Sequence, residues 1–141
     1  MIVLDTDHVT LLQEGDPRAE RIHQRLVLLG ANQHFPISIV TYEEQMRGWM
    51  DRLTKSDTMA RQIQTYRKLE AHVAFYSTVA ILAFTEQAAI EFQRLRKLKV
   101  RIGTMDLKIA AIALSLHATL CTRNRRDFEK VPALRFEDAT L

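Results

Sequence analysis

The chain opens on an unbroken apolar run, Ile2-Val3-Leu4, which leads directly into the polar triplet Asp5-Thr6-Asp7. Three consecutive β-favouring residues are typical of a strand buried on both faces, as in a parallel sheet. Shorter apolar stretches with turn-forming neighbours recur along the chain and predict further strands. These predicted strands cover 35–40, 78–84, 119–122 and 134–136.

Between the strands, the apolar spacing changes to the three- and four-residue steps of helices. Ile22, Leu26 and Leu29 share one stripe, with Asp16-Pro17 as a helix start before them and Gly30 as a stop after them. The predicted helices cover 7–13, 17–29, 41–53, 55–76, 86–97 and 105–117, with a short turn over 125–128.

Strands that alternate with helices predict an α/β fold with a central, mainly parallel sheet of four to five strands and helices on both faces. The sequence contains no internal repeat, low-complexity stretch or linker. We therefore expect one domain over residues 1–141, a length that suits a single hydrophobic core.

Composition narrows the class of protein. Apolar residues make up 47% and charged residues 26% of the chain, which is the mixture of a soluble globular domain. A single cysteine, Cys121, cannot form an internal disulfide. No apolar run approaches the roughly 20 residues of a membrane span. Because the first strand is predicted from residue 2, we expect no targeting segment and a cytoplasmic protein without membrane contact.

The net charge of +3 is compatible with a nucleic-acid partner but does not establish one. Basic residues form two groups, one over 94–101 and one over 123–130. Taken alone, each group is interpreted as basic side chains on solvent-exposed helix faces and loops. The second group also contains an acid, Asp127, which gives it more chemical interest.

Acidic residues fall where the predicted strands end. Asp5 ends the first strand, Glu43 and Glu44 open the helix after the second, Asp106 lies in the first turn of helix 105–117, and Asp127 follows the fourth strand. The carboxyl ends of parallel strands share one edge of a sheet, so these side chains can converge on one crevice. Gathered carboxylates need a proton or a cation to coexist, which suggests a divalent-metal site.

Two positions are ambiguous from the sequence. Adjacent helix residues point about 100° apart, so only one of Glu43 and Glu44 can face inward. Gly48, one turn beyond Glu44, leaves open space on that face and favours Glu44. Asp106 heads the apolar stripe of its helix and is either a helix-start acid or a ligand at the floor of a cleft.

The remaining candidates have structural interpretations. The five histidines show no metal-ligand spacing, so we do not expect zinc. Trp49, with Met46 and Met50, gives the helix after the second strand a broad apolar surface, for which core packing is the default.

Four stretches, which follow one another in order, resemble the PIN-domain ribonucleases and, within them, the VapC toxins of type II toxin–antitoxin pairs, and the resemblance extends over essentially the whole chain. They are Leu4–Asp7, Ser38–Glu44 with Gly48, Ile102–Ala111 and Thr122–Phe128. The resemblance implies a PIN-like three-layer α/β/α sandwich and a metal-dependent endoribonuclease that cleaves RNA such as tRNA or rRNA. It also implies a cognate VapB-like antitoxin and a homodimer, with the Trp49 surface as a dimer contact or antitoxin groove.

By that resemblance, Asp5, Glu44 and Asp106 hold Mg²⁺ or Mn²⁺. One position departs from the broad PIN pattern, because Asn124 stands where many members carry a fourth acid. Asp127, three residues later, is the alternative fourth acid; it would contact the metal directly, contact it through water, or organise the site. The resemblance also assigns supporting roles to Thr6, Thr122 and Asn124 and RNA contacts to Arg123, Arg125 and Arg126.

Two alternatives stay open at this point. An apolar strand followed by Asp-x-Asp also opens the haloacid dehalogenase-like phosphatases, in which Asp5 would be a nucleophile. That class requires a paired-acid motif downstream, whereas one acid, Asp106, stands in its helix start. A degenerate PIN domain would instead bind RNA or an antitoxin without cleaving, and the departure at Asn124 keeps this second alternative open.

Overall fold

The computed structural model describes residues 1–30 and 35–141, so the predicted strand over 35–40 adjoins undescribed residues. Three strands form one ladder in the order β1-β4-β5, and both pairings are parallel. The other two described strands, β2 and β3, form a separate parallel pair. The strands are β1 (Ile2–Leu4), β2 (Ile37–Ser38), β3 (Ile81–Leu82), β4 (Thr119–Cys121) and β5 (Arg135–Glu137).

The parallel α/β architecture confirms the fold predicted from the sequence, but β2, β3 and β4 are shorter than predicted. The prediction of strand 35–40 was wrong beyond Ser38, since the Ser38 side chain accepts a hydrogen bond from the Thr41 backbone N–H and caps a helix that begins at Ile39. Ser, unlike Ile or Val, can cap a helix through its side chain, and this ends the strand. No ladder joins β1 to β2 among the described residues.

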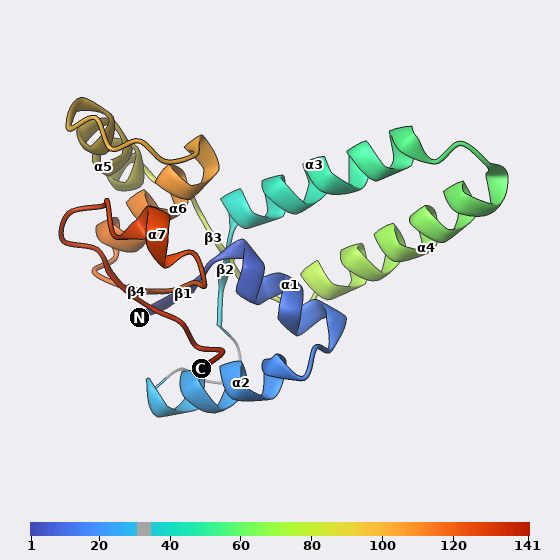
Figure 1. The fold of residues 1–141 in the computed structure, drawn as a ribbon, viewed down its shortest axis with the longest axis horizontal. Helices are drawn as coiled ribbons and strands as arrows, with labels where there is room; N and C mark the ends of the chain where they lie inside the picture. Colours follow the sequence, from blue (N-terminus) through green and yellow to red (C-terminus); the bar gives the residue numbers. More distant parts are fainter. Residues whose placement is uncertain (31–34) are drawn as a thin grey trace.

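Seven helices lie between the described strands, and their order follows the prediction closely (Figure 1). Gly15 ends the first helix with the left-handed φ of 63° that favours glycine. No helix in the described part of the chain has the length and apolarity to cross a membrane. The helices are α1 (Thr6–Glu14), α2 (Arg18–Leu28), α3 (Ile39–Lys55), α4 (Met59–Tyr76), α5 (Glu86–Lys97), α6 (Thr104–Ser115) and α7 (Arg125–Phe128).

Two hydrophobic clusters lie on opposite faces of the β1-β4-β5 ladder, so the molecule has three layers. Val3 and Leu120 belong to the cluster that includes α5 and α6. Leu4 and Cys121 belong to the cluster that includes α1 and α2. Successive strand residues point to opposite faces, which explains why an unbroken apolar run suits β1. Small residues such as Ala110, fully buried in α6, let that helix lie close to the sheet.

Helices α3 and α4 form an antiparallel pair that projects from the sheet (Figure 1). The two faces of α3 differ in their surroundings. Met46 and Met50 line a groove on one face, whereas Trp49 lies against His72 of α4, with ring centroids 5.9 Å apart. The single apolar surface expected around Trp49 is therefore divided between two sides of the helix.

Candidate active site

Asp5 lies at the carboxyl end of β1, where the sheet meets α1. Its backbone N–H still donates to the Cys121 carbonyl, at 2.9 Å, which continues the ladder into the site. Its carboxylate accepts from the Thr6 backbone N–H at 2.8 Å and from the Thr122 hydroxyl at 2.7 Å. Asp5 is thus both the N-cap of α1 and a buried acid, with only 5% of its surface exposed.

Thr6 connects the start of α1 to α3. Its hydroxyl donates to Glu44 Oε1 at 2.8 Å, so the Thr41 hydroxyl, 3.1 Å away, donates to Thr6. Glu43 lies elsewhere, paired with Arg47 one turn along the helix, at 2.7 Å. Of the two acids, Glu44 is therefore the one that contacts Thr6, next to Asp5. Gly48, where an added Cβ would meet nothing within 4 Å, lines the hollow that contains Trp49 and His72.

Asn124 links the two remaining acids. Its side-chain amide donates to Asp127 Oδ2 at 3.0 Å and lies 3.5 Å from Asp106 Oδ2. Its backbone N–H donates to the Thr122 hydroxyl at 3.0 Å, which ties this amide to the oxygen that contacts Asp5. Asp127 also has a cation nearby, because Lys130 Nζ lies 3.8 Å from its Oδ1.

The electrostatics of Asp5 and Asp106 indicate crowded carboxylates. Burial, followed by the charge of Asp7, raises the pKa of Asp5 from 3.8 to about 7. Burial, followed by the charges of Glu44 and Asp127, raises the pKa of Asp106 to about 6. Within residues 1–30 and 35–141, no Lys or Arg forms an ion pair with Asp5, Glu44 or Asp106. A cation would therefore remove the repulsion.

Asp7 and His8 extend this site in a way that sequence reasoning missed. Asp7 accepts from the His8 Nδ1–H at 2.7 Å and from the Arg123 backbone N–H at 3.0 Å. Burial alone would raise the pKa of Asp7, but these two hydrogen bonds hold it below its ordinary value. Asp7 therefore remains a carboxylate that fixes the loop after β4, beside the Asp5–Thr122 contact.

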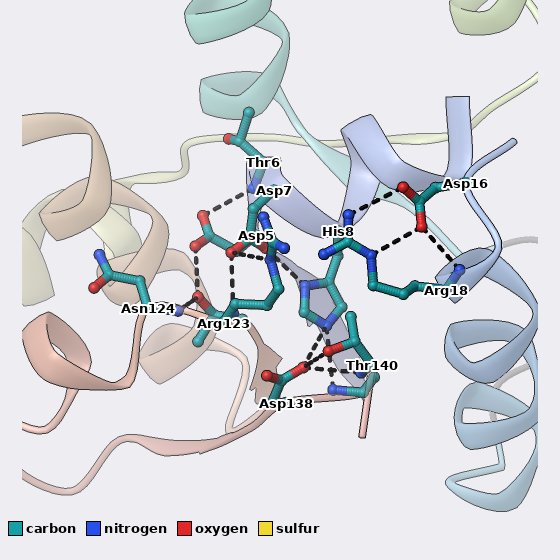
Figure 2. A network of polar contacts seen from close by, with 12 residues as sticks. Asp5, Thr6, Asp7, His8, Asp16, Arg18, Arg123, Asn124, Asp138 and Thr140 are labelled. Atoms are coloured by element: carbon teal, nitrogen blue, oxygen red, sulfur yellow. Dashed lines mark hydrogen bonds and ion pairs between the residues drawn. The ribbon is translucent and has the colours of Figure 1, made fainter. Parts of the chain in front are cut away.

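His8 is fully buried. Figure 2 shows that its ring lies beside Asp138 and Thr140, near the carboxyl terminus. Its Nε2 accepts from the Ala139 backbone N–H at 3.2 Å, so the proton of this neutral ring is on Nδ1. The Asp-x-Asp pattern after the first strand had already drawn attention to Asp7. No local pattern identifies a partner 131 residues away, so the role of His8 could not be read from the sequence.

The three arginines predicted to contact RNA lie along the loop after β4 and on α7, and all are exposed. Arg123 Nε lies 3.8 Å from Asp7 Oδ2, so this side chain stays near the site. Arg125 and Arg126 open α7, the helix that also carries Asp127.

The donor set suits a hard divalent cation. Across the described ranges, no three His, Cys, Asp or Glu side chains already form a cage around a metal position. The acids instead hold hydrogen bonds to Thr6, Thr122 and Asn124. Carboxylate oxygens that no Lys or Arg neutralises are the ligands that Mg²⁺ and Mn²⁺ prefer, and Mg²⁺ needs few protein ligands because it keeps several waters.

Comparisons with known proteins agree with this geometry. Residues 2–134 match the PIN domain family. Ribonuclease VapC1 of Haemophilus influenzae strain R2866 is 30% identical over 145 residues, which cover 98% of this chain and 97% of that protein. The tRNA(fMet)-specific endonuclease VapC of Salmonella typhimurium is 36% identical over 76 residues, 51% of this chain and 58% of that protein.

A solved structure shows the same likeness in three dimensions. The structure of VapBC-1 from nontypeable Haemophilus influenzae contains a chain that superposes with a TM-score of 0.72. That chain is 30% identical to this one, and the match covers 100% of both.

Proposed function

The chain belongs to the PIN-domain family and, within it, to the VapC ribonucleases, and we propose that it is a Mg²⁺-dependent endoribonuclease, the toxin of a toxin–antitoxin pair. One observation carries the proposal. Three acids lie within one hydrogen-bonded site, because Thr122 donates to Asp5, Thr6 donates to Glu44 and the Asn124 amide lies 3.5 Å from Asp106. No Lys or Arg of the described residues forms an ion pair with any of the three. Membership of this family also removes the haloacid dehalogenase alternative.

Asp5 and Asp106 would hold the metal most directly, with Glu44 completing the set or positioning the attacking water. When bound, a divalent ion neutralises charge on a phosphodiester and makes hydroxide available near neutral pH. Mn²⁺ has the same preference for carboxylate and water ligands and is expected to substitute.

The surrounding residues orient these acids. Thr122 holds one oxygen of Asp5, and Thr6 holds one oxygen of Glu44. Asn124 donates to Asp127 and lies near Asp106, so we assign Asp127 to organising the site through this amide. The side chains of Arg123, Arg125 and Arg126 are exposed, and as surface cations they would contact the RNA backbone.

We further propose two protein partners. A cognate VapB-like antitoxin would inhibit the ribonuclease, in keeping with the VapBC structure matched above. A second copy of the chain would cover the groove of about 760 Å³ on α3, whose lining includes Ile39, Met46, Met50 and Phe84. The partly exposed apolar side chains there, Ile39 at 39% and Met50 at 43%, support a homodimer contact.

Cleavage of a tRNA mixture tests the activity. We expect cleavage with Mg²⁺ or Mn²⁺ and none with EDTA. Asp5→Asn should fold, because an amide oxygen still caps α1, and should lower the cleavage rate at least about 100-fold. Metal-dependent cleavage retained by Asp5→Asn would refute the assignment. A folded wild type that binds RNA without cleaving it would instead favour the non-catalytic PIN-domain alternative.

A further inference from the structure

A second basic feature, which the proposed catalytic set does not use, adjoins the site. The segment between α5 and α6 lines a groove of about 860 Å³ that reaches Asp127 on α7. This segment connects α5 to α6 near α7 in Figure 1. Asp127 accepts a hydrogen bond from the Asn124 side-chain amide, and the same amide nitrogen lies 3.5 Å from Asp106 Oδ2. The groove therefore runs from the surface to the edge of the acidic site.

Three cations line this groove: Arg96, Lys99 and Arg101. All three are exposed, and none forms an ion pair with any residue of the described ranges. Arg94 on α5, by contrast, forms an ion pair with Glu91, in which Nη2 and Oε2 lie 2.8 Å apart. The groove cations thus keep their full charge for an external anion.

Local structure holds these cations along the groove. The Arg96 guanidinium lies over the Phe92 ring, 5.6 Å from its centroid, which supports the side chain against the groove wall. Lys99 has a left-handed φ of 58°, and the Val100 backbone N–H donates to the Leu95 carbonyl at 3.2 Å. This turn closes α5 and fixes the backbone from which Lys99 and Arg101 extend.

We propose that this groove binds the phosphate backbone of the RNA strand on one side of the bond to be cleaved, with Lys99 and Arg101 as the principal phosphate contacts. The proposal rests on the proposed ribonuclease function. Apolar side chains, Phe92 and Ile102, also line the groove, so bases can contact it between the cations. The groove ends at Asp127, beside the site of phosphodiester chemistry, which favours an RNA strand over an acidic polypeptide.

A pair of charge-matched variants tests the proposal. Lys99→Gln with Arg101→Gln removes two groove cations, and Lys97→Gln with Arg67→Gln removes two exposed cations that do not line the groove. RNA binding is measured in EDTA by fluorescence anisotropy across a salt series, using a labelled single-stranded RNA. Cleavage of an RNA that the wild type cuts is measured in parallel with Mn²⁺.

We expect the groove variant to bind RNA at least about tenfold more weakly, with a salt slope lowered by about 1.4 for two lost contacts. Its cleavage rate at saturating RNA should stay within about twofold of wild type, as for a group that contributes to binding alone. The control variant should match the wild type in both measurements. Thermal melts that coincide for all three proteins establish that the fold is intact.

Three results would overturn the proposal. The first is a groove variant that binds RNA as tightly as the control variant. The second is polyglutamate competing for the groove as well as RNA does at equal ionic strength, which would assign it to an acidic polypeptide. The third is an unchanged salt slope. A wild type that fails to cleave any RNA while the groove variant alone loses RNA binding would contradict the ribonuclease function and leave the groove as an RNA site.

Discussion

At the scale of single residues, Asp5 combines a structural and a chemical role. Its carboxylate caps α1 by accepting a hydrogen bond from the Thr6 backbone N–H. It also accepts a hydrogen bond from the hydroxyl of Thr122, which directly follows β4. Burial beside Asp7 nevertheless favours its protonated form, so its pKa rises to about 7. The ionised form that binds a cation is therefore unfavourable without that cation.

This pKa shift predicts how the stability of the metal-free protein depends on pH. In the unfolded chain Asp5 ionises near 3.8, whereas in the folded protein it keeps its proton up to about pH 7. The folded state thus binds more protons between these values, and the free energy of unfolding falls as pH rises from about 4 to 7. Asp5→Asn should flatten this fall and be more stable than wild type at pH 8, by roughly 2–4 kcal/mol.

Urea denaturation in EDTA at pH 5, 6.5 and 8 measures the effect. Asp51→Asn serves as the control, because Asp51 is exposed and pairs with Lys55 on the surface of α3. The pKa of Asp106 is also raised, so the free energy of unfolding of Asp5→Asn should still fall with pH, but less steeply than that of wild type. Equal pH slopes in wild type and Asp5→Asn would show that Asp5 does not hold a proton in the folded state.

At the scale of elements, α3 presents one acid to the site and one to solvent. Thr6 on α1 donates to Glu44, whereas Glu43 pairs with Arg47 on the same helix. The Thr6 hydroxyl thus joins the first turn of α1 to the second turn of α3. Thr41, which donates to Thr6 and is fully buried, adds a second point of contact.

The neighbouring glutamates of α3 give a matched pair of variants. Glu44→Gln should lower the rate of RNA cleavage by at least about 100-fold, because a carboxylate near Asp106 is lost. Glu43→Gln should leave the rate within about twofold, since an exposed ion pair contributes little. Rates with Mn²⁺ at saturating RNA measure both. Equal losses in the two variants would mean that α3 does not orient Glu44 alone toward the metal.

The sequence predicted the elements better than their ends. The helix over 86–97 and the turn over 125–128 were predicted with their observed bounds, because caps and periodicity are local. The strand predicted over 35–40 was too long, because Ser38 caps α3 and the strand therefore ends there. The acids at strand ends were predictable because parallel strands share an edge. The His8–Ala139 contact was not, because it depends on where the last residues of the chain dock.

At the scale of the molecule, the three layers bring together segments that are distant in sequence. Figure 2 shows how one network extends from Asp5 at β1 through Asp7 and His8 to Thr140 near the carboxyl terminus. Both ends of the chain thereby support the same site. Basic residues border it from two directions, with Arg125 on α7 and Arg101 in the groove after α5. An RNA strand that follows both would pass over the acids.

Mn²⁺ binding shows whether acids from β1, α3 and α6 together hold a divalent cation. Electron paramagnetic resonance of free Mn²⁺ at pH 7.5 gives the affinity of metal-free wild type, Asp106→Asn and the surface control Asp51→Asn. We predict that Asp106→Asn binds Mn²⁺ at least about tenfold more weakly than wild type, while Asp51→Asn is unchanged. Wild-type affinity in Asp106→Asn would show that Asp106 does not help to hold the cation.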